Sequence, residues 1–279
     1  KNYGNVSSSD GYAAGIAATN EGTIRDCVVS GGSGTGGIKI HSLGEKEIGA
    51  VCAINSGTVS GSYPEGNVTL QGNASIFGGV TGRNTGTVAV ITLTSMPAID
   101  ATKSKLTVGG AVGANEAIIT QIVAKDLKFA KFSGYRYLGG ITGTNGGSGK
   151  TTAGVSDCVY SGTMTEKTGA AGNCYGGIAG INYATLSGCE ITKITMEIKG
   201  VYTATSTSTA AQKESLASHA GGITGKNETS ATITSCVIDN NPDSRIRADY
   251  GMLGGVTGFN KGTITMSGSS ITVAVMNLT

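Results

Sequence analysis

Small or apolar residues alternate with polar residues in a short phrase that recurs along the chain. Within residues 80–88 one side of an extended chain carries Val80, Gly82, Asn84, Gly86 and Val88, and the other side carries Thr81, Arg83, Thr85 and Thr87. A period of two residues is that of a β-strand. The first set repeats in every copy and the second varies, so we expect the first set to point inward and the second to face water.

The phrase reads Gly-Gly-Ile/Val-x-Gly-x-Asn-x-Gly-Thr-Ile/Val and occurs eight times. Its asparagines are Asn20, Asn55, Asn84, Asn115, Asn145, Asn182, Asn227 and Asn260. The interval from Asn55 to Asn84 is 29 residues and the interval from Asn182 to Asn227 is 45. Internal repeats of this length with variable insertions are typical of solenoids.

Stacked coils would let each repeat bury an inner face that it cannot bury alone, with strands about 4.8 Å apart and like residues superposed. The sequence therefore predicts an all-β fold, a parallel β-solenoid (β-helix) of about eight coils with roughly thirty residues per repeat. We expect one domain over residues 1–279, and the crossover rule favours a right-handed coil.

The recurring residues of the phrase have physical roles in such a coil. Glycine pairs permit tight turns and a close approach of neighbouring backbones. An inward asparagine in every coil can bond its amide to the asparagines above and below. We therefore interpret the eight asparagines as a structural ladder and not as ligands of a metal or substrate.

Four of the six cysteines share one position in the repeat, after each phrase asparagine. They are Cys27, Cys158, Cys189 and Cys236, and the other copies carry Ser62, Ile91, Ile122 and Ser267 there. A position that accepts small and aliphatic residues is a packing position, so we expect a core cysteine ladder of reduced thiols. A disulfide between adjacent coils stays open, because the coil spacing permits one. The chain has no Cys-x-x-Cys spacing, and His41 and His219 form no ligand pattern, so no metal site is predicted.

Composition narrows the function classes. The 279 residues include 47 glycines and no tryptophan, aromatic residues make up 5%, and the net charge is +2. Such a chain is neither a basic nucleic-acid binder nor an enzyme with a deep aromatic pocket. No apolar stretch approaches the roughly 18 residues of a membrane span. The start at Lys1 lacks a secretory pattern, which is expected of a mature form or an excised fragment.

Three segments depart from the repeat and are predicted as irregular insertions, near residues 125–138, 193–220 and 239–253. The first is a candidate binding patch for an anionic glycan or a partner surface, or else an extra strand with solvated lysines. Its residues are Lys125, Lys128, Phe129, Lys131, Phe132, Tyr135, Arg136 and Tyr137. The second is expected to be a loop with a short helical turn near Ala210 to Leu216, and the third a turn at Asp239 to Asp243.

No catalytic motif is evident in the sequence. The chain lacks the HExxH, GxSxG and GxxxxGK[ST] motifs. Only Glu45 and Glu47, near His41, form a local acidic cluster, which we interpret as part of a solvated loop. The sequence predicts no catalytic residue and no cofactor.

The repeated phrase, read as Gly-Gly-Ile-x-Gly-x-Asn-x-Gly-x-Ile-x-x-Cys, resembles the GLUG repeat of bacterial cell-surface proteins, including stalk regions of immunoglobulin-A-cleaving metalloproteases and filamentous-haemagglutinin-like adhesins. The resemblance runs from about Ala14 to Gly268 and is closest at Gly140 to Asn145, Gly176 to Cys189 and Gly254 to Ile264. It departs at Ala53 and Ala111, where the family has Gly and Ile.

The resemblance implies a non-enzymatic, extracellular or cell-surface segment that acts as a stalk, spacer or adhesive surface. Its partners would be the rest of a larger surface protein, a glycan or a host surface, and neither nucleic acid nor a membrane span is expected. Two alternatives stay open. Chains could stack end to end into a filament, or one lateral face could bind or cleave a polysaccharide.

Overall fold

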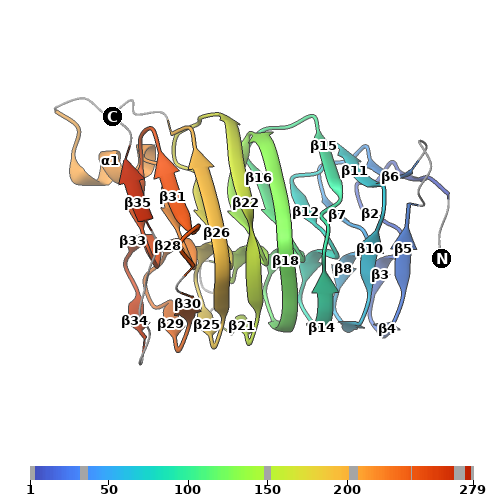
Figure 1. The fold of residues 1–279 in the computed structure, drawn as a ribbon. Helices are drawn as coiled ribbons and strands as arrows, with labels where there is room; N and C mark the ends of the chain where they lie inside the picture. The colour runs from blue at the N-terminus through green and yellow to red at the C-terminus, as the bar shows by residue number, and fades with distance from the viewer. Residues whose placement is uncertain are drawn as a thin grey trace.

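The computed structural model describes residues 4–31, 37–147, 152–200, 207–239, 241–266 and 274–277. The chain winds into a parallel β-solenoid of about seven stacked turns, each of about 32 residues. The axis runs from the blue N-terminal end to the red C-terminal end in Figure 1. The fold class is as the repeat predicts. The expected eight coils become seven because eight asparagine positions enclose seven complete turns.

Two eight-stranded sheets contain the phrase as far as its asparagine. Sheet 1 consists of β2 (Ala13–Ala14), β7 (Glu47–Gly49), β12 (Ile76–Gly78), β16 (Leu106–Gly109), β19 (Tyr135–Gly139), β23 (Cys174–Gly176), β27 (His219–Gly221) and β32 (Met252–Gly254). Sheet 2 consists of β3 (Ala17–Asn20), β8 (Cys52–Asn55), β13 (Thr81–Asn84), β17 (Val112–Asn115), β20 (Thr142–Asn145), β24 (Ala179–Asn182), β28 (Thr224–Asn227) and β33 (Thr257–Asn260).

A 13-stranded sheet, sheet 3, closes each turn. Its strands are β4 (Thr23–Arg25), β9 (Thr58–Ser60), β14 (Thr87–Leu93), β18 (Ile118–Ser133), β21 (Gly154–Ser156), β22 (Val159–Thr168), β25 (Thr185–Ser187), β26 (Glu190–Ile198), β29 (Thr232–Thr234), β30 (Val237–Ile238), β31 (Arg245–Ala248), β34 (Thr263–Thr265) and β35 (Ala274–Asn277).

Six further strands lie in two small sheets at the N-terminal end. One sheet has β1 (Val6–Ser8), β6 (Ile38–Ser42), β11 (Val68–Gly72) and β15 (Ala98–Ala101), and the other pairs β5 (Val28–Ser30) with β10 (Tyr63–Glu65). The described part of the chain has one helix, α1 (Ala210–Leu216). Within that part, no helix is long and apolar enough to cross a membrane.

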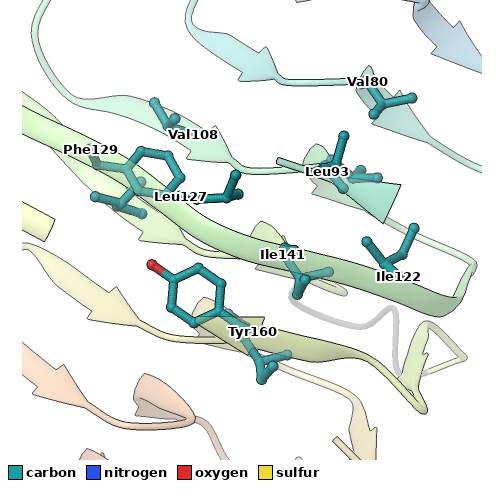
Figure 2. Packing of buried hydrophobic residues seen from close by; sticks show 14 of the residues in the cluster. Val80, Leu93, Val108, Ile122, Leu127, Phe129, Ile141 and Tyr160 are labelled. Carbon is teal, nitrogen blue, oxygen red and sulfur yellow. The ribbon is translucent and has the colours of Figure 1, made fainter. Parts of the chain in front are cut away.

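Apolar side chains superpose along the inside of the solenoid. In sheet 1 the in-register column is Ala13, Ile48, Phe77, Val108, Leu138, Tyr175, Ala220 and Leu253. Sheet 3 adds residues such as Leu93, Ile122 and Leu127, which meet Val80, Val108 and Ile141 across the interior (Figure 2). The core is therefore a long column of small section, which suits a chain poor in aromatic residues.

The Gly-Gly pair of the phrase, which is Ala14-Gly15 in the first copy and Gly49-Ala50 in the second, forms the corner between sheets 1 and 2. A Cβ on Gly78 would collide with the carbonyl of Thr81, and one on Gly79 with the carbonyl of Gly110 in the next turn. Sheet 2 folds back so closely that the outer faces of sheets 1 and 2 meet beside the corner. The expectation that residues such as Thr81 face water is therefore wrong near the corner, because Thr81 and Thr142 are completely buried there.

The three predicted insertions differ in structure. Within residues 125–138, β18 continues to Ser133 and pairs with β22 with shifts of register, and β19 follows at Tyr135. Within residues 193–220, β26 extends to Ile198, and the expected helical turn is confirmed as α1. A turn at 242–243 follows, in which Asn241 Oδ1 accepts from the Asp243 amide at 3.0 Å, and the segment ends in β31 and the start of β32.

Candidate functional site

The eight phrase asparagines form one continuous column in sheet 2. Each Nδ2 donates to the Oδ1 of the next asparagine toward the C-terminus, from Asn20 to Asn260, over 2.8 to 2.9 Å. The same amides bond to backbone carbonyls, as Asn145 Nδ2 does to Thr185 O at 3.0 Å. The column thus satisfies polar groups that the stack buries, and its amides are occupied with one another.

The four cysteines of the predicted ladder lie at one place in the coil, two residues after the ends of β4, β21, β25 and β29 of sheet 3. Cys158, Cys189 and Cys236 are completely buried in successive turns, and Cys27 is partly exposed beside Ser62, whose Oγ accepts from the Cys27 amide at 3.0 Å. All six cysteines are free thiols. A hydrogen bond with Cys158 and burial raise the pKa of Cys189, and burial raises the pKa of Cys52 to about 11.

The exposure of each cysteine predicts the order in which the thiols react. Cys27 should react with a thiol reagent within the time of mixing, and the other five should stay protected because none is more than 3% exposed. Unfolding in denaturant without reductant should release six thiols per chain. A count of four would instead establish a disulfide between neighbouring turns.

The candidate patch predicted from sequence does not form one surface. Lys125 and Lys128 are exposed on β18, whereas Phe129 is 5% exposed and points into the core (Figure 2). The assignment of Phe129 to a binding surface is wrong, because the alternation of the strand turns its side chain inward beside Leu127 and Val108. The side chains of Lys131 and Phe132 lie outside the described residues. Tyr135 packs against the core, and burial raises its pKa to about 12.

Arg136 and Tyr137 lie elsewhere, in a pocket beside the corner of sheets 1 and 2. This pocket, the corner pocket, has a volume of about 270 Å³. Strands β19, β23, β24, β27 and β28 form its floor, and α1 forms one wall. Its lining residues are Arg136, Tyr137, Gly172, Cys174, Ile181, Tyr183, Glu214, Ser215, His219, Lys226 and Glu228.

Ion pairs organise the charged side of the corner pocket. Lys226 Nζ lies 3.0 Å from Glu214 Oε1 and 2.5 Å from Glu228 Oε1, and Lys261 Nζ lies 2.7 Å from the same Glu214 oxygen. The hydrogen bond from Lys261 lowers the pKa of Glu214. Burial raises the pKa of Tyr183, which precedes Glu228 by one turn in the same register, to about 12. At neutral pH Glu214 is therefore ionised, and Tyr137 and Tyr183 are neutral.

Cys174 and His219 occupy the deepest part of the pocket, in register on β23 and β27. Cys174 Sγ is 3.7 Å from His219 Nδ1, and both residues are at most 3% exposed. Burial raises the pKa of Cys174 to about 12 and lowers that of His219 to about 4. Both groups are neutral at pH 7, so this pair lacks the thiolate that nucleophilic catalysis needs.

Among the described residues, no three Cys, His, Asp or Glu side chains are placed to hold a metal ion. Glu45 and Glu47 do not share a solvated loop. Glu47 is buried in β7 and pairs with Arg83 at 2.8 Å, whereas Glu45 pairs with Lys103. The acidic cluster near His41 is thus divided between a surface ion pair of the exposed Glu45 and a buried ion pair of Glu47.

Sequence reasoning missed Cys174, Tyr183, His219 and Lys226 as neighbours. A usable signal was present, because Cys174 and His219 each precede a Gly-Gly pair by two residues and therefore share a register. The residues that follow the phrase asparagines, Tyr183 and Glu228, share another register. Superposing the repeats predicts both columns, but the fold of sheet 1 against sheet 2 is needed to bring them together.

A second polar cluster surrounds Glu166, which is 2% exposed in β22. Tyr175 Oη donates to Glu166 Oε1 at 2.7 Å, and the Lys199 amide donates to Oε2 at 2.8 Å. Burial nevertheless raises the pKa of the Glu166 carboxyl. The folded state therefore holds this proton at pH values where the unfolded chain has lost it.

This shift makes stability depend on pH. The contribution of protonated Glu166 is complete below the unfolded pKa of about 4.3 and is lost as pH rises toward the higher folded pKa. Glu166→Gln should flatten the fall in melting temperature between pH 4 and pH 7, whereas the exposed Glu65→Gln should leave that slope unchanged. Equal slopes for Glu166→Gln and the unmodified protein would contradict the assignment.

No protein-family model, curated protein or solved structure matches the chain.

Proposed function

We propose that the chain is a non-enzymatic structural or adhesive segment of an extracellular surface protein, where it acts as a stalk or spacer. The observation that carries the proposal is the unbroken asparagine ladder, with seven successive amide bonds from Asn20 to Asn260. Such a ladder uses one recurring polar position per turn to hold neighbouring turns in register.

Two further features support this proposal. The phrase resembles the GLUG repeat of bacterial surface proteins. The only thiol and imidazole that meet in the corner pocket, among the described residues, form a neutral pair without an activated nucleophile. A rod of nearly constant section suits a spacer, because its length grows with the number of turns and needs no other change.

Surface labelling tests the proposal. An antibody against the chain should label intact cells of the source organism, and proteinase treatment of those cells should remove the label. Labelling that requires permeabilised cells would overturn the extracellular assignment. Release of reducing ends from a polysaccharide panel by the purified chain would overturn the non-enzymatic one.

The direction of the ladder favours a second candidate, end-to-end assembly. Every Nδ2 donates toward the C-terminal neighbour, so an added turn, from a longer chain or a second copy, joins in one orientation. Asn260 is exposed at the C-terminal side of the described ladder. Copies joined this way would make a heterologous contact that does not close. The apparent molar mass from light scattering should then rise with protein concentration. A molar mass that stays that of the monomer at high concentration would exclude the filament.

A further inference from the structure

Two departures from the regular repeat meet at the corner pocket. One is a β-bulge in β19 and the other is the long segment between β26 and β27 that contains α1. Neither is needed for stacking, since other turns close without them. Irregular features that converge on one cavity are a common sign of a binding site, because bulges re-aim side chains and insertions build walls.

The bulge places Arg136 at the pocket. Leu106 pairs with Tyr135 and the adjacent Thr107 pairs with Tyr137, so Arg136 is the extra residue. Tyr137 keeps the outward position of its column and Arg136 lies over its ring, with 5.2 Å from Cζ to the ring centroid. The guanidinium makes no ion pair with any residue in the described ranges.

The insertion supplies the opposite wall and is fixed in place. Thr209 caps α1, where its side chain accepts from the Gln212 amide and the Gln212 side chain accepts from the Thr209 amide. Glu214 then anchors the helix to Lys226 and Lys261. The wall is thus held by a capping box and two ion pairs, and it presents Glu214 and Ser215 to the cavity.

The lining suits a sugar ring. Tyr137 and Tyr183 offer aromatic surface for its C–H face, and Glu214, Glu228 and Ser215 offer oxygens to its hydroxyl groups. Lys226 is already shared by two glutamates, so Arg136 is the lining cation that can pair with a ligand. A guanidinium group binds a carboxylate through paired hydrogen bonds. The volume of about 270 Å³ is that of a small site.

We propose that the corner pocket binds a single carboxylate-bearing monosaccharide unit, with the carboxylate on Arg136 and the ring against Tyr137 and Tyr183. This site is separate from the asparagine ladder and from the proposed spacer role, and either can fail without the other.

Matched sugars test the ligand class. Saturation-transfer NMR would be recorded with methyl glycosides of glucuronic, galacturonic and sialic acid, each against its carboxyl-reduced counterpart. We expect at least one acid to bind about tenfold more tightly than its reduced form, because one charged hydrogen-bond pair is lost on reduction. Absence of binding for all three acids at millimolar concentration, or equal binding of acid and reduced forms, would overturn the proposal.

Matched variants test the location. Arg136→Gln should weaken binding of that acid about tenfold, and Lys128→Gln, an exposed change on β18, should alter it less than about twofold because rim-exposed charges contribute little. Both side chains are exposed, so circular dichroism and the melting temperature should match those of the unmodified protein. An equal loss in both variants would indicate non-specific attraction to lysine and arginine and would refute the pocket.

Discussion

Replacing Asn145 by alanine should lower the free energy of unfolding by about 2–4 kcal/mol, because buried partners lose hydrogen bonds that water cannot replace. Asn145 is completely buried. It accepts from Asn115 Nδ2 at 2.9 Å, and its own Nδ2 donates to Asn182 Oδ1 at 2.8 Å and to Thr185 O at 3.0 Å. Denaturant unfolding followed by circular dichroism would measure the loss.

Asn260→Ala is the matched control, with the same chemistry at an exposed position. Asn260 accepts from Asn227 at 2.8 Å and donates to Gly262 O at 3.1 Å, but water can take over both roles. Its loss should stay below about 1 kcal/mol. Similar small losses for Asn145→Ala and Asn260→Ala would mean that the ladder follows the stacking and does not stabilise it.

Repetition explains why the fold could be predicted from this sequence. A residue type that recurs at the same phrase position must fit the same environment in each turn, so Asn84 and Val80 indicate an inner face without any knowledge of the sheets. The strand pairings follow directly, since Asn84 lies between Asn55 and Asn115. The short helix was also predictable, because Ala210 to Leu216 lacks the β-branched residues of the preceding run.

The site was less predictable for a physical reason. Alternation assigns a side chain to one of two faces, but it does not say what covers the outer face. Thr81 is outward in its strand and still buried, because sheet 1 folds against sheet 2 at the glycine corner. Lys128 lies on β18 in sheet 3, whereas Arg136, eight positions later, is the bulged residue of β19 in sheet 1. Linear proximity therefore suggested a single basic and aromatic patch that the fold divides.

The glycine corner should be the position least tolerant of substitution. A Cβ on Gly140 would lie well inside the 3.0 Å that real Cβ atoms keep, against both the Gly177 carbonyl of the next turn and the ring of Tyr160. Tyr160 is completely buried in the apolar core (Figure 2). Gly140→Ala should thus cost more than about 4 kcal/mol or abolish soluble expression.

Gly154→Ala controls for the change of residue type, because nothing lies within 4 Å of the added methyl group and the glycine φ is not positive. It should leave the melting temperature unchanged or raise it slightly, by reducing the freedom of the unfolded chain. The double variant Gly140→Ala, Tyr160→Leu separates the two collisions. Partial recovery assigns part of the cost to the ring and the rest to the Gly177 carbonyl, which no side-chain change can move. If Gly140→Ala had the same melting temperature as the unmodified protein, neighbouring turns would not be packed as closely as the corner requires.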